Sequence, residues 1–530
     1  MTLANAVRLA WRHRRDLHKL VFYVRAFGPA KALARIRSDL RGLGGVADYA
    51  AWVADYDTLG PADLAAVQAL VDALAERPLI SLVLTGDGDR QPSLVSLRQQ
   101  VYPHWQLCDA VAAAAGDFVG VLAAGDELAP HALALIAAEI AAHAEADLVY
   151  GDDDRLDAAG RRVAPRFKPD WDPELLAGLD YLTPFSVVRR GLAAAAGDGE
   201  AGGLAVRAAA QARCIRHIPH VLYHGRGPRA AAAPQAAPPL PEPPPLVSLL
   251  VPTRDGLELV RACVDGLLHG TDYPALEVLI LDNGSQAPET LAWFDDIQAD
   301  ARVRVLPCPG PFNFSAINNA GVAAARGSVV GFVNNDIKVI GPDWLRQMVA
   351  QASRPEIGAV GAKLLYGDGT VQHGGVTLGI GGVAAHAHRG FPGDHPGDME
   401  RLRLTRSVAA VTAACLVMRK SLFAEVGGFD AEHLAVAFND VDLCLKLGAR
   451  GYRIVWTPRA ELYHLESVSR GGDLDAGKRE RFRAETLAMR RRWGPLLDAD
   501  PFYNPNLTLH AGDFAPAFPP RRPLPWRSGG

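Results

Sequence analysis

The chain has 530 residues, of which 49% are hydrophobic and 22% charged, and its formal net charge is −4. This length has room for roughly two to four domains with conventional cores, and the small net charge excludes a molecule whose whole surface binds nucleic acid. The six cysteines are scattered without a CxxC pair, which argues against a zinc cage or a disulfide framework and predicts a protein of the reducing cytosol.

The first expected element is a basic helical segment at residues 1–75. Its first 41 residues hold ten lysines and arginines against two aspartates, with apolar residues at helical spacing. A basic amphipathic helix can bind an anionic membrane surface, so this segment predicts a cytoplasmic protein with peripheral contact to the inner membrane surface. The alternative is a helix that packs on the protein and exposes its basic face to solvent. No apolar run approaches the roughly 20 residues that cross a bilayer.

Beyond this segment the chain repeats one plan twice, at residues 76–226 and 247–500. The stretch between them, residues 227–246, is rich in alanine and proline, which predicts an extended linker. A proline-rich tail follows at residues 501–530. The sequence therefore predicts two related domains, a linker and a tail.

The two copies differ where polar residues follow apolar runs. The run at residues 116–122 matches the run at 327–333, yet Ala-Ala-Gly follows the first and Asn-Asn-Asp follows the second. In the first copy an aspartate, Asp126, comes one residue later. Because the first copy keeps its core strands and loses polar residues, we predict that it is a reduced domain with a structural or acceptor-binding role.

The second copy alternates between expected strands and helices. Apolar runs predict strands at residues 247–251, 276–281 and 303–306, and apolar residues at helical spacing predict helices at 257–269 and 314–325. This alternation predicts an α/β domain with a mostly parallel sheet and right-handed crossovers. Neither a GxGxxG turn nor a P-loop follows a strand, which argues against a nicotinamide site and a P-loop nucleotide site.

The most informative motif is Asn334-Asn335-Asp336, which ends an apolar run. In an open α/β sheet, ligands bind just beyond the carboxyl ends of the strands. A lone carboxylate flanked by amides at that edge suits an oxygen-seeking cation that holds a diphosphate. The alternative is a strand that ends in a turn rich in Asn and Asp.

Five motifs in the second copy carry a resemblance to a known family. They occur in the order VSLLVPTRDG (247–256), LDNGS (281–285), FVNND (332–336), VGGFD (426–430) and FNDVDLCL (438–445). Together they resemble the family 2 glycosyltransferases with a GT-A fold, particularly the rhamnosyltransferase-like branch that builds cell-surface polysaccharides. The resemblance is strong over residues 246–507 and weak over residues 49–224.

This resemblance implies a fold and a function. The second copy would be a GT-A domain, which is Rossmann-like with a mostly parallel sheet, and the first copy would be a reduced GT-A-like domain. The activity would be that of an inverting, metal-dependent glycosyltransferase. It would move a sugar, with rhamnose the implied example, from a nucleotide-diphosphate sugar donor to a hydroxyl of a cell-surface glycan or a lipid-linked glycan acceptor.

Two other functions stay open at this point. One is a non-catalytic glycan-binding or scaffold protein. The other is a sugar-phosphate nucleotidyltransferase, which would need a glycine-rich basic phosphate loop early in the domain. Only TRDG at residues 253–256 could serve as that loop.

The resemblance also implies which residues bind the donor and its metal. Six residues would contact the nucleotide sugar: Pro252, Thr253, Asp255, Asp282, Asn334 and Asn335. Asp336 and His464 would bind Mg²⁺ or Mn²⁺, which stabilises the charge on the departing diphosphate. From the residues alone, Asp282 also suits a tight turn because Asn-Gly follows it.

Asp440 is the expected catalytic base. The family usually has Glu-Asp at this point, and this chain has Asn-Asp. A carboxylate in the first turn of a helix stays ionised because the helix dipole favours it, so it could take the proton of the acceptor hydroxyl. The alternative is an ordinary helix cap. Asp442 lies about 200° further around the helix and is expected to anchor neighbouring structure.

A glycine- and histidine-rich stretch lies at residues 368–376 and 386–390. We expect it to form a mobile loop near the acceptor. His386 and His388 could bind a metal, but no carboxylate is placed to join them.

Overall fold

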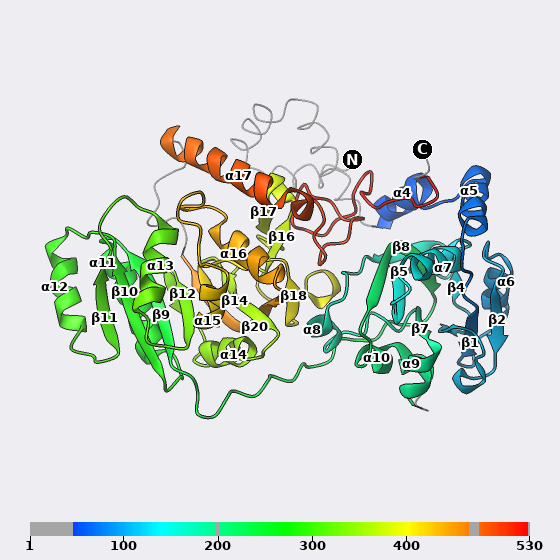
Figure 1. The fold of residues 1–530 in the computed structure, drawn as a ribbon, viewed down its shortest axis with the longest axis horizontal. Coiled ribbons are helices and arrows are strands. Elements are labelled where there is room, and N and C mark those ends of the chain that lie inside the picture. Colours follow the sequence, from blue (N-terminus) through cyan, green and yellow to red (C-terminus); the bar gives the residue numbers. More distant parts are fainter. Residues whose placement is uncertain (1–45, 198–200, 466–475, 528–530) are drawn as a thin grey trace. The chain divides into compact units, whose positions relative to one another are not determined.

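The computed structural model describes residues 46–197, 201–465 and 476–527. The basic part of the predicted N-terminal segment, residues 1–45, lies outside the described residues. The chain divides into two compact units (Figure 1). The first unit comprises Met1–Trp171, Asp180–Ala231 and Asn504–Gly530, and the second unit comprises Asp172–Leu179 and Ala232–Tyr503.

The second unit is built on a ten-stranded sheet whose main path runs β11-β10-β9-β12-β19-β14-β20-β13. The strands of this path are β9 (Val247–Thr253), β10 (Leu276–Asp282), β11 (Val303–Pro307), β12 (Val329–Val333), β13 (Ile337–Val339), β14 (Ile357–Leu365), β19 (Cys415–Arg419) and β20 (Arg453–His464). The first four strands of the path are parallel, as the sequence predicts, and β19 is antiparallel to both of its neighbours. Two further strands, β15 (Val371–His373) and β18 (Arg406–Val408), pair with β14 and β20.

The parallel strands are buried on both faces. Successive side chains of a strand point to opposite faces of its sheet, and here Leu249 and Val251 of β9 contact one core while Leu250 contacts the other. In β10, Ile280 likewise contacts the first of these cores and Leu281 contacts the second. Burial on both faces explains why these strands are mostly apolar in the sequence, with a buried polar residue inside β9 (Ser248) and inside β10 (Glu277).

Helices and one small hairpin complete the second unit. The helices are α8 (Pro173–Leu176), α11 (Leu257–His269), α12 (Pro288–Ile297), α13 (Phe314–Ala324), α14 (Trp344–Ala352), α15 (Lys420–Glu425), α16 (Asn439–Gly448) and α17 (Ala476–Leu497). The hairpin joins β16 (Val376–Leu378) and β17 (Ala384–His386). The expected mobile loop of residues 368–376 and 386–390 therefore contains β15, the start of β16 and the end of β17.

The first unit repeats the strand order of the second. Its main path runs β2-β1-β3-β7-β5-β8-β4, which corresponds to β10-β9-β12-β19-β14-β20-β13. The strands are β1 (Ile80–Thr85), β2 (Trp105–Cys108), β3 (Phe118–Ala123), β4 (Glu127–Leu128), β5 (Leu148–Leu156), β6 (Arg162–Arg166), β7 (Ser186–Arg189) and β8 (Ile215–Gly225). The strand β6 pairs with β5 as β15 pairs with β14. Within the described residues, β11 and β18 have no counterpart in the first unit.

The boundaries of the units differ from those expected. Residues 46–75, placed in the N-terminal segment by the sequence, form α4 (Val46–Tyr56) and α5 (Pro61–Asp72), and Tyr49 donates a hydrogen bond to Asp154 at 2.7 Å. The proline-rich tail also belongs to the first unit, because Trp52 donates to the carbonyl of Ala517 at 3.1 Å. The remaining helices of the first unit are α6 (Gln91–Arg98), α7 (Ala132–Ala142), α9 (Arg190–Ala195) and α10 (Leu204–Ala209).

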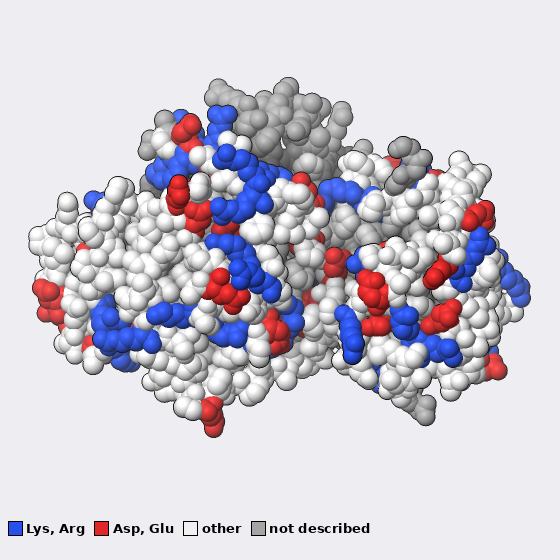
Figure 2. All heavy atoms as spheres, in the orientation of Figure 1, with Lys and Arg blue, Asp and Glu red and all other residues white. Residues whose placement is uncertain are grey.

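Charged side chains of both signs are interspersed on the visible face of each unit (Figure 2). Of the helices in the described part of the chain, none has the length and the apolar character needed to cross a bilayer.

Candidate functional site

Three strand ends meet at one edge of the second unit's sheet. Asp282, the last residue of β10, is in register with Thr253, the last residue of β9. Asn335 follows β12, and its side-chain amide donates to Oγ1 of Thr253 at 2.9 Å. The structure therefore brings together three of the predicted donor-binding residues at the carboxyl edge of parallel strands, where α/β sheets bind ligands.

The loop after β9 is shaped by Asp255. Its carboxylate accepts hydrogen bonds from the backbone of Ala287 at 2.9 Å and Gln286 at 2.7 Å, and these bonds lower its pKa. Asp255 and Gly256 both have positive φ angles of 50° and 65°, so the chain reverses sharply here. Pro252 lies within β9, opposite Leu281 of β10. Oδ1 of Asp255 thus fixes the loop. Oδ2 has no hydrogen-bond partner in the described part of the chain.

Asp282 takes part in a turn and also ends a strand. Its carboxylate accepts a hydrogen bond from the backbone of Ser285 at 2.8 Å, as a turn residue does. Its second oxygen has no hydrogen-bond partner among the described residues. The neighbouring Asn283, which the sequence did not single out, donates to the carbonyls of Cys308 at 2.8 Å and Gly310 at 3.2 Å. Asn283 therefore ties the end of β10 to the loop after β11.

The pairing of β13 with β20 brings the two predicted metal ligands together. Ile337 is in register with His464, so Asp336 lies beside this histidine, with 3.1 Å between Oδ1 of Asp336 and Nε2 of His464. Both side chains are buried. Although this distance is short, Oδ1 of Asp336 makes no hydrogen bond within the described residues. A buried carboxylate oxygen without a hydrogen bond is uncommon and suits a bound cation.

The ring of His464 is oriented by Gln372 of β15. Nδ1 of His464 lies 2.5 Å from Oε1 of Gln372. Because an amide oxygen only accepts, Nδ1 carries a proton, and in the neutral ring the lone pair of Nε2 then faces Asp336 and Asn334. Histidines that bind metals are held in this way by a second residue on the other ring nitrogen.

Within the described residues, no three His, Cys, Asp or Glu side chains are grouped closely enough to enclose a metal. Asp336 and His464 supply two ligand atoms, and the amide of Asn334 lies 3.2 Å from Nε2 of His464. These donors fit a metal that takes its other ligands from a substrate.

Asp440 lies in the first turn of α16. Its Oδ2 atom accepts a hydrogen bond from the backbone of Ala413 at 3.1 Å, and its carboxylate also bonds to the side chain of Thr412. Burial raises its pKa, although these hydrogen bonds oppose the shift. Phe438 occupies the N-cap position, but Oδ1 of Asp440 accepts from the backbone of Val441 at 2.8 Å, so this carboxylate also stabilises the first turn of α16, as the alternative expects. Asp442 is fully buried and bonds to Arg492 at 2.7 Å.

The backbone before β19 links the metal ligands to Asp440. Ala413 donates to Asp440, and the carbonyl of the next residue, Ala414, accepts from the backbone of Asn334 at 3.0 Å. Two consecutive residues therefore hold the predicted base and the predicted metal-binding turn. The site is assembled from segments far apart in the sequence, which meet at this backbone.

The first unit keeps equivalent positions but uses them internally. Glu127 is in register with His224, as Ile337 is with His464, so Asp126 corresponds to Asp336 and His224 to His464. Asp126 accepts hydrogen bonds from the hydroxyl of Tyr223 and from the backbone of Arg226. His224 bonds to Asp154 at 2.6 Å. These atoms already have protein partners, and α10, the counterpart of α16, has no acidic residue in its first turn.

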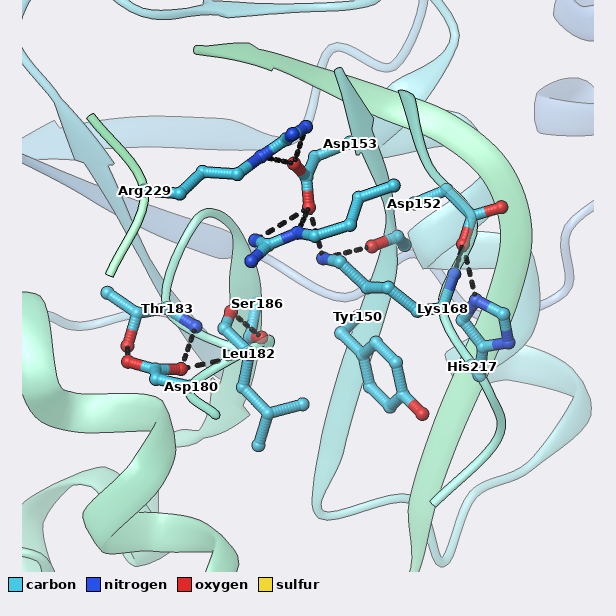
Figure 3. A network of polar contacts seen from close by, with 12 residues as sticks. Tyr150, Asp152, Asp153, Lys168, Asp180, Leu182, Thr183, Ser186, His217 and Arg229 are labelled. Atoms are coloured by element: carbon cyan, nitrogen blue, oxygen red, sulfur yellow. Dashed lines mark hydrogen bonds and ion pairs between the residues drawn. The ribbon is translucent and has the colours of Figure 1, made fainter. Parts of the chain in front are cut away.

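A buried network of charges fills the adjacent part of the first unit (Figure 3). Asp153 of β5 contacts Arg166 at 2.9 Å, Lys168 at 3.1 Å and Arg229 at 2.8 Å. Burial by itself would raise the pKa of Asp153, but the three cations lower it well below the usual range. Asp152 contacts His217 at 2.9 Å. The carboxylates of β5 are thus neutralised by the protein itself, which favours a structural role for this unit.

We expect Asp153→Asn to destabilise the first unit by about 3–5 kcal/mol, because it leaves buried cations without their carboxylate. The melting transition of this unit should fall by roughly 10 °C, measured by circular dichroism. Asp157→Asn is the matched control, since the side chain of its partner Arg161 is 79% exposed and exposed ion pairs contribute little. Equal melting curves for the two variants would contradict a stabilising role for the network.

Comparison with known proteins defines the class of this chain. Residues 243–486 match the family described as glycosyltransferase like family 2. The chain is also 32% identical to the N-acetylglucosaminyl-diphospho-decaprenol L-rhamnosyltransferase of Mycobacterium tuberculosis, over 38% of this chain and 70% of that protein. The chain therefore belongs to glycosyltransferase family 2. The predicted family, with its glycosyltransferase domain at residues 243–486, and the α/β fold class are confirmed.

Two longer relatives cover both units. Over 91% of this chain, it is 39% identical to the uncharacterized protein y4gI of Sinorhizobium fredii. Over 88% of this chain, it is 37% identical to the O-antigen biosynthesis protein RfbC of Myxococcus xanthus. It spans 64% and 43% of the lengths of these two proteins.

Proposed function

We propose that the second unit is an inverting, metal-dependent glycosyltransferase. It moves a sugar from a nucleotide-diphosphate donor to a hydroxyl of a cell-surface glycan or a lipid-linked glycan. The observation that carries this proposal is that Asp336 lies 3.1 Å from His464, in a turn whose Asn334 bonds to Ala414, while the adjacent Ala413 bonds to Asp440. The names of two relatives, one in O-antigen biosynthesis and one an L-rhamnosyltransferase, support a surface polysaccharide as product and L-rhamnose as the sugar.

The nucleotide binds along the ends of β9 and β10 in this proposal. The free oxygens of Asp255 and Asp282 accept hydrogen bonds from the base or the ribose, because ionised carboxylates act only as acceptors. Pro252 and Thr253, at the end of β9, lie directly before the loop that contains Asp255. The side-chain amide of Asn335 donates to Oγ1 of Thr253 at 2.9 Å and so orients it.

Asp336 and His464 would hold Mg²⁺ or Mn²⁺, with Asn334 beside them. When bound, the ion supplies positive charge to the leaving diphosphate. The contribution of the chain is to keep the two ligand atoms 3.1 Å apart in a buried setting. Gln372 keeps the lone pair of His464 directed to the same point.

Asp440 takes the proton of the acceptor hydroxyl as that oxygen attacks the anomeric carbon on the side opposite the diphosphate. One displacement inverts the configuration at that carbon. The raised pKa of Asp440 makes its carboxylate a better proton acceptor than an exposed aspartate. The diphosphate leaves without being protonated, so one carboxylate suffices.

Peripheral contact with the cytoplasmic face of the membrane is part of this proposal. The ten basic residues among the first 41 support it, because basic segments are attracted to anionic lipids.

A panel of dTDP-, UDP- and GDP-sugars with Mn²⁺ tests the proposal. We expect dTDP-L-rhamnose to raise the melting temperature, because a ligand at 100 times its Kd stabilises the folded form by about 2.7 kcal/mol. Slow release of the nucleoside diphosphate should accompany binding and should require the metal. If no nucleotide sugar shifts the melting curve, the proposal is wrong. Binding without any release or transfer would favour the glycan-binding scaffold.

A further inference from the structure

Two histidines beside the proposed site have no part in the mechanism above. His373, the last residue of β15, is fully buried, and His386, the last residue of β17, is partly exposed. Their Nδ1 atoms lie 2.7 Å apart and their rings are perpendicular. A contact this short between two ring nitrogens requires one ring to donate a proton and the other to accept it.

The protein fixes which ring donates. The backbone N–H of Thr412 donates to Nε2 of His373 at 3.4 Å, so this nitrogen carries no proton. In a neutral imidazole the proton of His373 is then on Nδ1, and Nδ1 donates to Nδ1 of His386. His386 must therefore carry its own proton on Nε2.

Both rings are neutral near pH 7. Burial, with smaller contributions from Arg389 and His464, lowers the pKa of His386 to about 4. Burial also lowers the pKa of His373 well below its usual value, with contributions from His386, Arg406 and His464. A neutral pair keeps the tautomers derived above.

The chain of hydrogen bonds ends at an unused donor. It runs from Thr412 through His373 to His386, and Nε2–H of His386 has no hydrogen-bond partner in the part of the chain that the structure describes. His386 is partly exposed, and its Nε2 atom is not among the fully buried polar atoms that lack a partner, so this N–H group can reach a ligand.

The pair is connected to both halves of the proposed site. Thr412 bonds to the carboxylate of Asp440, so the series of hydrogen bonds through the two histidines begins at the proposed base. Gln372, the residue before His373, orients the proposed metal ligand His464. Adjacent residues of a strand point to opposite sides, so β15 contacts the metal side with one residue and the base side with the next. In the proposed mechanism the sugar reacts at the two groups that Thr412 and Gln372 contact, Asp440 and the metal ligand His464.

The segments that carry the two histidines are joined to neighbouring segments by several contacts. Gly375 has a φ of 87°, and a Cβ atom there would lie 2.8 Å from Val408, so this turn requires glycine. The carbonyl of Gly375 accepts from Ala387 at 2.9 Å, next to His386. The carbonyl of Gly374 accepts from the buried guanidinium of Arg406. Hydrogen bonds therefore tie this loop to its neighbours on both sides of the pair.

We propose that His386 is a substrate-binding residue whose Nε2–H donates a hydrogen bond to a sugar hydroxyl in the site, and that His373 is the positioning residue that fixes its tautomer. The proposal rests on the proposed function, because it needs a sugar between Asp440 and the metal ligands. The hydroxyl belongs to the sugar of the donor or to that of the acceptor, which present the same chemistry.

Two variants of His386 separate the roles of its nitrogens. His386→Asn keeps an oxygen near the position of Nδ1, where it can accept from His373, but lacks the N–H at Nε2. His386→Gln keeps an N–H group near the position of Nε2. We expect His386→Asn to weaken sugar recognition about tenfold, the effect of one lost hydrogen bond, and His386→Gln to recover most of it. His433→Asn, whose side chain is 51% exposed, is the control.

The two arms of the experiment identify the sugar. One arm compares the affinities of dTDP-L-rhamnose and dTDP by calorimetry with Mn²⁺, and the other measures KM for N-acetylglucosaminyl diphosphate with an octyl chain. A loss for dTDP-L-rhamnose but not dTDP assigns the bond to the donor, and a loss confined to KM assigns it to the acceptor. If His386→Asn matches wild type in both arms, or if the two variants are equally impaired, the proposal is wrong.

A measurement without any ligand keeps this test separate from the proposed function. Nitrogen-15 NMR of protein labelled at histidine should show His386 protonated on Nε2 and His373 on Nδ1. The opposite assignment would overturn the proposal whatever the nucleotide sugars do. The correct tautomers together with no binding of any nucleotide sugar would instead contradict the proposed function, and with it the role of His386.

Discussion

Asp440→Asn is expected to reduce glycosyl transfer by about 10²- to 10⁴-fold, the usual contribution of a general base. The asparagine has nearly the shape of aspartate and keeps an oxygen that can accept from Ala413, so the turn before β19 should remain intact. Affinity for the nucleotide sugar should stay close to that of wild type, because Asp440 acts on the acceptor. Steady-state kinetics and calorimetry with the same donor measure the two quantities.

Glu432→Gln is the control for this experiment. Glu432 also lies between β19 and β20, and its side chain is 85% exposed. The transfer activity of the Glu432→Gln variant should therefore match that of wild type. If Asp440→Asn retains full transfer, the base is a different residue. If the variant loses donor binding to the same extent as transfer, Asp440 belongs to the donor site.

Asp336→Asn is expected to lower turnover by about 10²-fold or more, since a metal at a departing phosphate stabilises the transition state by several kcal/mol. The variant removes the charge from the buried Oδ1 atom that faces His464. Stimulation by Mn²⁺ should disappear or require far higher concentrations. Nucleoside diphosphate release, measured across a Mn²⁺ titration, tests both expectations.

The control for this variant is Asp343→Asn, an exposed aspartate that follows β13. It should respond to Mn²⁺ as wild type does. An Asp336→Asn variant with unchanged Mn²⁺ dependence would show that the metal binds elsewhere or is not needed.

The sequence was sufficient to predict the elements that depend on local patterns. β9, β10 and β12 are mostly apolar because both of their faces are buried, and polar residues mark where they end. The position of Asn334–Asp336 beyond β12 follows from the same rule. His464 was found through the family resemblance, although the same Tyr-His pair recurs near the end of β8 in the first unit.

Features that depend on strand pairing could not be predicted. Alignment without gaps set Asp126 one residue away from Asp336, whereas the pairing of β4 with β8 makes them equivalent. The roles of Gln372 and His373 follow from the pairing of β15 with β14 and from contacts to residues about 90 and 40 positions later. No periodicity within a short segment carries that information.

The division of the chain was predicted only in part for a similar reason. The proline linker is visible in the composition, but the return of the chain to the first unit after Tyr503 is not. Asn504 donates to Asp152 at 2.9 Å, in a buried network that the composition of a proline-rich tail gives no reason to expect. The contacts of Asn504 with β5 and of Ala517 with α4 are tertiary contacts that no local pattern encodes.

The most direct test of the central claim is anomalous diffraction from a crystal soaked with Mn²⁺ and the nucleoside diphosphate of the bound donor. We predict one strong manganese peak in contact with Asp336 and His464, with diphosphate oxygens completing its ligands and the nucleotide along the ends of β9 and β10. A nucleotide bound in the second unit with no metal at Asp336, or a manganese peak beside Asp126 in the first unit instead, would contradict the account.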